Sequence, residues 1–340
     1  LATYGIIYNE SVLQDLAIPT PTAWSDLTHP KLLGKVAVCD PGKSSVCKKT
    51  LELMVQAEIA RIRIAHPDDS EAQACREGWQ SALKVMQGVF ANARYITENS
   101  MKPILDVANG SCAMGLTVDY FALGEAEMVE KRSHQARIGF IAPQLGYTVE
   151  ANSIAKLRGA PNPKLAEAFI EYTMSLEGQA LWGLKADTPG GPKRYTLHRM
   201  PIRRDFYSDP KYLAYRSDPT QNPYAEGTPH NAIGYHPAWT AGIFGPLHRI
   251  AQCVFIDPQP ELAEAWAAIL EARQQGRMHD AQAALTHMQQ FPGLDYDSIQ
   301  GPLAHFLKTG SRQAIFAWQC TLTEQFIKQY RHSTALARGH

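Results

Sequence analysis

Residues 35–45, with the sequence KVAVCDPGKSS, constrain the fold of this chain more than any other segment. An apolar run at residues 36–39 is followed by a tight turn containing Pro41 and Gly42, and helical periodicity then continues through Met54. This pattern predicts a buried strand that leads directly into the N-terminus of a helix. The first amides of such a helix have no internal partner and lie at the positive end of its macrodipole, so the junction is suited to bind an anion.

Polar and basic residues gather at this junction. Ser44 or Ser45 can cap the helix. Three lysines follow in and after the turn, with no carboxylate between Lys43 and Glu52: Lys43, Lys48 and Lys49. Because the macrodipole disfavours cations at this end, an anionic ligand would offset the conflict. An ordinary capped turn is the alternative. The expected solute contacts here are Asp40, Lys43, Ser44 and Ser45.

Size and composition limit the class of protein. A chain of 340 residues suits two domains, and an apolar content of 45% indicates a globular fold. Lys plus Arg and Asp plus Glu both number 33, so no overall field attracts nucleic acid or an anionic membrane. No apolar run reaches the roughly 18 residues that a transmembrane helix needs. The sequence opens inside a strand-like segment, residues 1–8, so we expect an N-terminal piece to lie outside it.

The cysteines and histidines do not predict a metal centre. Six cysteines are scattered without Cys-x-x-Cys or zinc-ligand spacing, so we expect no structural metal and no cofactor. Cys39 and Cys47 flank the turn closely enough for a bridge in an oxidising compartment, although free buried thiols are the favoured interpretation. The following histidines also lack ligand spacing and are interpreted as surface or structural residues: His134, His198, His230, His236 and His248.

Strand-like and helix-like segments alternate up to about residue 130. Strands are expected at residues 36–39, 91–95 and 112–118, and helices at 46–65, 77–87 and 101–108. Such alternation is typical of a mostly parallel α/β sheet, in which ligands bind at the carboxyl ends of the strands. Two further loops follow strands and are expected to converge with the first. Their candidate residues are Glu98, Asn99 and Ser100 in one loop, and Asp119 and Tyr120 in the other.

The second half of the chain has a different character. Strands are expected at residues 137–141 and 148–157, and helices then dominate at 165–174, 177–184, 260–273, 281–290 and 312–330. A region rich in Pro and Gly, residues 188–237, separates the second helix from the third. So many helices with so few strands are expected to pack on a sheet built mainly by a segment outside this sequence.

These segments carry a family resemblance. Motifs occur in the expected order at residues 4–9 (YGIIYN), 21–30 (PTAWSDLTHP), 34–44 (GKVAVCDPGKS), 91–94 (ANAR), 109–110 (NG) with Gly115, Asp119 and Tyr120, 159–163 (GAPNP), 175–179 (SLEGQ), 189–192 (PGGP) and 199–201 (RMP). Across nearly its whole length the chain resembles the periplasmic solute-binding proteins of ABC importers with class II topology. The resemblance is to the branch that contains ferric-iron and sugar-phosphate binders.

The resemblance implies a fold and a function. The implied fold is α/β, of the class II periplasmic-binding-protein type, with one Rossmann-like lobe largely complete and the helical C-terminal part of the other lobe. The implied boundaries are a hinge strand at residues 1–8, the second lobe at 9–135, return hinge strands at 136–157 and part of the first lobe at 158–340. The implied protein is a periplasmic monomer that captures a solute between two lobes and delivers it to a membrane permease without catalysis.

Two alternatives concern the solute and the chemistry. Iron-binding relatives carry two adjacent tyrosines near the position of Tyr120, but the second residue here is Phe121, which has no donor atom. A small anionic or phosphorylated organic solute is therefore the leading hypothesis, and ferric iron is the alternative. Residues 37–44 nearly match the P-loop pattern of nucleotide hydrolases. Ala37 replaces the first glycine, however, and Pro41 removes one amide, so this hypothesis is remote.

Overall fold

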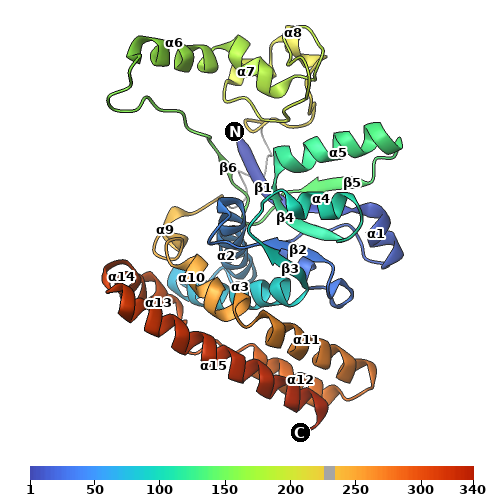
Figure 1. The fold of residues 1–340 in the computed structure, drawn as a ribbon, viewed down its shortest axis with the longest axis vertical. Helices are drawn as coiled ribbons and strands as arrows, with labels where there is room; N and C mark the ends of the chain where they lie inside the picture. The colour runs from blue at the N-terminus through green and yellow to red at the C-terminus, as the bar shows by residue number, and fades with distance from the viewer. Residues whose placement is uncertain (226–233) are drawn as a thin grey trace.

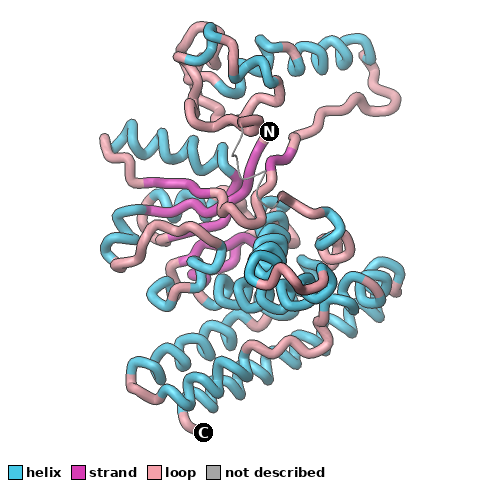
Figure 2. Tube along the Cα trace, turned by 180° about the vertical axis from the view of Figure 1, so that it is seen from behind, coloured by secondary structure: helices cyan, strands magenta, loops and turns pink. Residues whose placement is uncertain are grey.

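The computed structural model describes residues 1–225 and 234–340, so His230 lies outside the described residues. Figure 1 shows a central α/β unit, a module of short helices above it, and a layer of long helices below it. Figure 2 shows the same three parts from behind. None of the described helices is long and apolar enough to cross a membrane.

A six-stranded mixed sheet forms the centre of the α/β unit. Its strands are β1 (Ala2–Asn9), β2 (Val36–Cys39), β3 (Ala93–Thr97), β4 (Met114–Val118), β5 (Ile138–Ile141) and β6 (Val149–Glu150). The order is β3-β2-β4-β1-β5, with β6 paired to β1. β2 is parallel to β3 and β4, whereas β1 is antiparallel to β4, β5 and β6. The expected α/β class is confirmed. The sheet is mostly parallel, as expected, since five strands run in one direction and β1 alone runs against them.

The direction of β1 brings its first residues to the end of the sheet at which β2, β3 and β4 finish. Tyr4 of β1 is paired with Val118 at the end of β4. Cys39 and Thr97, which end β2 and β3, are also paired with each other. We call this end, defined by Tyr4, Cys39, Thr97 and Val118, the carboxyl edge. The three loops that the sequence singled out all leave the sheet here.

Helices of the α/β unit cover both faces of the sheet. They are α1 (Glu10–Asp15), α2 (Ser45–Ala65), α3 (Glu71–Ala91), α4 (Lys102–Ala108) and α5 (Asp119–Ser133), with short 3-10 turns at Trp24–Thr28 and Pro30–Leu32. Leu51, Met54 and Ile59 of α2 are completely buried. Since α2 has apolar residues on most of its surface, it needs partners on the side away from the sheet as well.

The C-terminal helices provide that second cover. They are α9 (Pro237–Thr240), α10 (Leu247–Ala251), the π-helical turn η5 (Gln252–Ile256), α11 (Gln259–Gln274), α12 (Met278–Met288), α13 (Tyr296–Gln300), α14 (Pro302–Thr309) and α15 (Arg312–Arg338). Phe255 stacks on Phe90 of α3 with ring centroids 5.4 Å apart. The indole of Trp79 donates to the Leu294 carbonyl at 2.8 Å. Residues 234–340 therefore share one core with the α/β unit, which differs from the expectation that all of 158–340 belongs to the other lobe.

Residues 151–225 form the upper module, which is far less compact. It contains α6 (Pro163–Met174), α7 (Leu176–Gly183), the 3-10 turn Arg204–Tyr207 and α8 (Pro210–Leu213). A small cluster that includes Leu184, Phe206 and Tyr212 holds α7 to the following loop. α6 buries no residue at all. The return strand expected at residues 148–157 is confined to Val149 and Glu150, and the chain beyond it is exposed.

Candidate functional site

The first two predicted loops lie side by side at the carboxyl edge. Ser44 caps α2, and its hydroxyl oxygen accepts a hydrogen bond from the Cys47 amide at 3.2 Å. The hydroxyl of Ser100, in the second loop, donates to the same oxygen at 3.1 Å. Lys43 Nζ lies 3.8 Å from Glu98 Oε1. The structure thus joins the loop at residues 40–45 directly to the loop at 98–100.

The turn before α2 uses some of its amides internally and leaves others available. The Asp40 carbonyl accepts hydrogen bonds from the amides of Lys43, at 3.0 Å, and Ser44, at 2.8 Å. Within the described residues, no acceptor binds the next two amides, those of Ser45 and Val46. Ser45 also lines a cavity of about 510 Å³. The start of α2 therefore offers two amide donors beside a space large enough for a small molecule.

The three lysines near this turn already have partners, which the sequence did not reveal. Lys43 faces Glu98, and Lys48 Nζ lies 4.3 Å from the centroid of the Phe244 ring. Lys49 Nζ lies 2.8 Å from Glu52 Oε2 and also pairs with Glu150. Side chains of the protein itself therefore compensate the positive charges at the start of α2. These charges no longer argue for an anionic ligand.

The ion pair of Lys49 belongs to a network that sequence reasoning missed. Tyr235 and Thr240 donate their hydroxyl hydrogens to Glu52 Oε1 at 2.6 and 2.7 Å, and Tyr4 donates to Glu150 Oε2 at 3.1 Å. Burial favours the neutral amine, but the bonds to the two glutamates raise the pKa of Lys49. Only the short spacing from Lys49 to Glu52 was visible in the sequence, because the other partners are distant along the chain.

Asp119 lies at the carboxyl edge but is completely buried. Its Oδ2 accepts from the Thr3 amide at 3.0 Å, and its Oδ1 accepts from the Tyr120 amide at 2.7 Å. Burial raises the pKa of Asp119 to about 7, although these two hydrogen bonds act in the opposite direction. The carboxylate therefore holds β1 against the start of α5. Its burial differs from the expected contact with solute hydroxyls.

Tyr120 is more open to a ligand. The guanidinium of Arg199 lies 3.7 Å from the centroid of its ring, a cation–π contact that the sequence did not reveal. Tyr120, Phe121 and Met101 help line a cavity of about 220 Å³ between the α/β unit and the upper module.

In the second loop, residues 98–100, the side chains of Glu98 and Asn99 are exposed. The Asn99 side chain accepts from the Met101 amide at 2.9 Å, so it shapes the start of α4.

His198 links the upper module to α5. Its Nε2 lies 2.8 Å from Glu127 Oε2, and its Nδ1 lies 3.2 Å from Asp218 Oδ2. Burial lowers the pKa of His198, but the two carboxylates outweigh this effect and raise it. This placement agrees with a structural role for His198.

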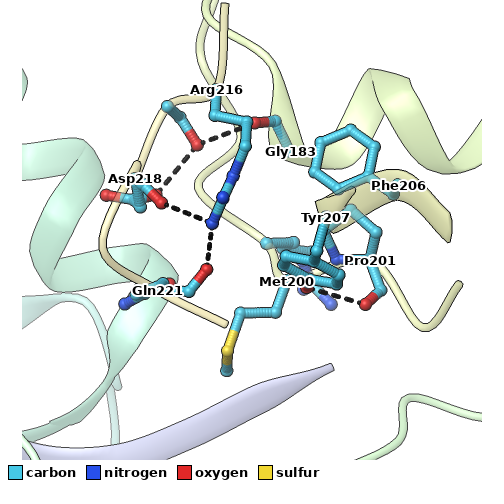
Figure 3. A pocket seen from close by; sticks show the side chains of 10 residues that line it. Gly183, Met200, Pro201, Phe206, Tyr207, Arg216, Asp218 and Gln221 are labelled. Carbon is cyan, nitrogen blue, oxygen red and sulfur yellow. Dashed lines mark hydrogen bonds between the residues drawn. The ribbon is translucent and has the colours of Figure 1, made fainter. Parts of the chain in front are cut away.

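The cavity drawn in Figure 3 lies next to this link and is too small for a solute. Its volume is about 10 Å³, the size of one water molecule. Its polar groups bond one another: Arg216 donates to the carbonyls of Asp218 and Gln221, and Ser217 donates to Asp218 Oδ2 at 2.8 Å. We therefore assign these residues to the packing of the upper module.

The cysteines of this region are free thiols. Cys39 and Cys47 are buried and unbridged, and the Cys47 thiol donates to the Cys39 carbonyl at 2.8 Å. Burial raises the pKa of the Cys39 thiol to about 11, so it is protonated at neutral pH. Among residues 1–225 and 234–340, no group of three or more His, Cys, Asp and Glu side chains is placed to hold a metal ion.

The N-terminal part of the chain is similar to known proteins. The model of the family "Bacterial extracellular solute-binding protein" matches residues 1–203. An uncharacterized protein of Haemophilus influenzae is 26% identical over 187 residues, which cover 54% of this chain and 46% of that protein. This chain thus spans about half the length of the relative. The family resemblance is confirmed, and the family model matches up to residue 203, a shorter span than the nearly complete length that we expected.

Solved structures match the same share of the chain. The periplasmic binding protein AfuA from Actinobacillus pleuropneumoniae, with fructose-6-phosphate bound, is 22% identical with a TM-score of 0.38, covering 53% of this chain and 49% of that one. Iron-bound HitA from Pseudomonas aeruginosa is 18% identical with a TM-score of 0.33, covering 52% and 50%. Because the family model itself matches more than half of the residues, this chain belongs to the family of bacterial extracellular solute-binding proteins.

Proposed function

We propose that this chain is part of the extracytoplasmic solute-binding component of an ABC importer, and that it binds its solute at the carboxyl edge. The observation that carries this proposal is the joining of two loops there by the hydroxyls of Ser44 and Ser100, 3.1 Å apart. Binding surfaces in α/β sheets gather at this end of the strands. The 510 Å³ cavity lined by Ser45 and Tyr4 gives a small solute room to bind.

The solute we propose is a small organic molecule with an anionic group, such as a phosphate ester. The support is the pair of amides at Ser45 and Val46, which lie at the positive end of the α2 macrodipole and lack an acceptor within the described residues. Ser44, Ser45, Ser100 and Tyr120 are the proposed contacts. Fructose-6-phosphate is the first probe, because the solved structure of the periplasmic binding protein AfuA contains it.

The proposal is one of binding without turnover. A nucleotide hydrolase would need the loop amides at residues 42–44 to surround phosphates, but two of them bind the Asp40 carbonyl instead. Membership of a solute-binding protein family also supports binding without turnover. The implied location is outside the inner membrane, and the implied partner is the permease of the importer, to which the protein would deliver the solute as a monomer.

The decisive experiment separates the amide of Ser45 from its side chain. Ser45 is the first residue of α2, a position at which proline fits the helix while removing the N–H. Calorimetric titration with fructose-6-phosphate should show binding that Ser45→Pro weakens about 10- to 100-fold, the loss expected for one hydrogen bond to a charged group.

Ser45→Ala is the matched control, because it removes the hydroxyl and keeps the amide. Its dissociation constant should stay within about threefold of the original. Equal losses in the two variants would show that the amide does not bind the anion. ATP hydrolysis that disappears in Lys43→Ala would instead support the nucleotide hydrolase.

A further inference from the structure

Another large cavity lies outside the part of the chain that matches the family. It has a volume of about 550 Å³ and lies between α10 and α14. Gln300, the last residue of α13, and Gly301, which connects α13 to α14, form part of its wall. A cavity of this volume falls within the usual range for organic ligands, roughly 300–1,000 Å³.

The ionisable side chains around this cavity are all basic. Its basic lining residues are His248, Arg249, His305 and Lys308, and no Asp or Glu is found among the described residues that line it. We call it the basic cavity. Because acidic and basic residues are equally frequent in the whole sequence, the composition of the chain does not account for this one-sided lining.

The charges in the basic cavity also lack compensation. Within the described part of the chain, none of these four residues forms an ion pair, and Arg249 has only a 3.5 Å contact with the Gln319 side chain. The lysines beside α2 differ, since Lys43 and Lys49 face glutamates. Arg249 is half-buried and Lys308 is exposed, so solvent screens part of their mutual repulsion. An anion bound between them would be attracted to both cations.

The positive charges near the cavity also affect the pKa of His248. Burial lowers its pKa, and the positive charges of Lys48 and Arg249 lower it further. The Gly245 carbonyl and Asp40 act in the opposite direction, but they do not outweigh these effects. Its Nδ1 lies 3.0 Å from the Gly245 carbonyl and therefore carries a hydrogen, which leaves Nε2 as the atom that can take up a proton.

We propose that the basic cavity binds a small organic molecule carrying at least two negative charges, such as a phosphorylated metabolite. Arg249 and Lys308 supply permanent cations to this anion, and His248 becomes a third cation by taking a proton when the anion binds. The basic cavity adjoins the carboxyl edge, since Ala241 lines both this cavity and the 510 Å³ cavity. Its two permanent cations belong to the C-terminal helices, so the inference does not depend on the function proposed above.

Calorimetric titration of the whole chain with inorganic pyrophosphate, at low ionic strength, tests the proposal. The double variant Arg249→Gln/Lys308→Gln should bind at least about tenfold more weakly. Lys328→Gln is the control, because it removes one positive charge from an exposed position of α15. Its affinity should stay within about twofold of the original. Titration in two buffers of different ionisation enthalpy should also show proton uptake, and His248→Gln should abolish it.

The outcomes distinguish this site from the carboxyl edge. Pyrophosphate binding that survives Ser45→Pro but fails in the double variant supports the basic cavity. Binding that fails in Ser45→Pro and survives in the double variant would place the anion at α2 and overturn the inference. Absence of binding at about 1 mM pyrophosphate would overturn it as well, whatever the result at the carboxyl edge.

Discussion

Helices α2 and α6 belong to the same family match but differ completely in their surroundings. Leu51, Met54 and Ile59 of α2 are fully buried between the sheet and the C-terminal helices. In α6 no residue is buried, and Leu165 and Phe169 are 70% and 57% exposed. Figure 1 shows α6 at the outer end of the upper module, away from the sheet. The periodicity that predicts a helix does not say what covers its apolar side.

The largest expected difference between the two regions concerns aromatic side chains. Helix α3 packs on α2, and its residue Phe90 stacks on Phe255. Phe90→Ala should lower the free energy of unfolding by about 3–5 kcal/mol because it leaves a cavity. Phe169→Ala in α6 should change it by less than about 0.5 kcal/mol. Chemical denaturation followed by circular dichroism measures both. A loss above about 2 kcal/mol for Phe169→Ala would show that α6 is packed in solution.

Local sequence signals predicted the α/β unit well. The capped junction at Ser44, the strand at residues 36–39 and the helices before and after β3 follow from hydrophobic period and capping chemistry, which act over a few residues. The start of α2 and the closeness of the loops at residues 40–45 and 98–100 were predicted in this way. Contact of these loops with a solute stays a prediction.

Long-range contacts were beyond this reasoning. The direction of β1 depends on where the chain enters the unit, and the burial of Asp119 depends on the Thr3 amide, 116 residues away. The partners of Glu52 are Tyr235 and Thr240, separated from it by 183 and 188 positions. The C-terminal helices share the α/β core because α2 and α3 expose apolar surface on the side away from the sheet. The apolar residues of α2 and α3 could be seen in the sequence, but the segment that covers them could not.

Two ion pairs give the next comparison. Glu52 pairs with the largely buried Lys49 and accepts hydrogen bonds from two hydroxyls, whereas Glu167 of α6 pairs with Lys156 at the surface. Glu52→Ala should cost about 3 kcal/mol of unfolding free energy, because it leaves buried donors without an acceptor. Glu167→Ala should cost less than about 1 kcal/mol. Equal losses in denaturant titrations of the two variants would contradict the difference in burial.

The smallest expected effect tests the link between the two regions at His198. Its pKa is raised by Asp218 and Glu127, while Lys131 pairs with Glu127, and Arg216 donates to the Asp218 carbonyl at 3.1 Å. A raised pKa means that the folded state holds the proton more tightly than the unfolded state. The stabilisation is therefore fully present below the ordinary histidine value of 6.5 and is lost as the pH rises through the raised pKa.

His198→Gln should lower the free energy of unfolding by about 1–2 kcal/mol at mildly acidic pH, and by much less at alkaline pH. His134→Gln is the matched control, since His134 is exposed and both histidines have a left-handed backbone, with φ of 55° and 51°. Asp119 also makes stability fall as the pH rises, because its pKa is raised to about 7. The loss of stability due to Asp119 occurs between its ordinary pKa of 3.8 and its raised pKa of about 7, and it should disappear in Asp119→Asn. If the loss in His198→Gln were the same at every pH, the imidazolium would not be the group that ties the upper module to α5.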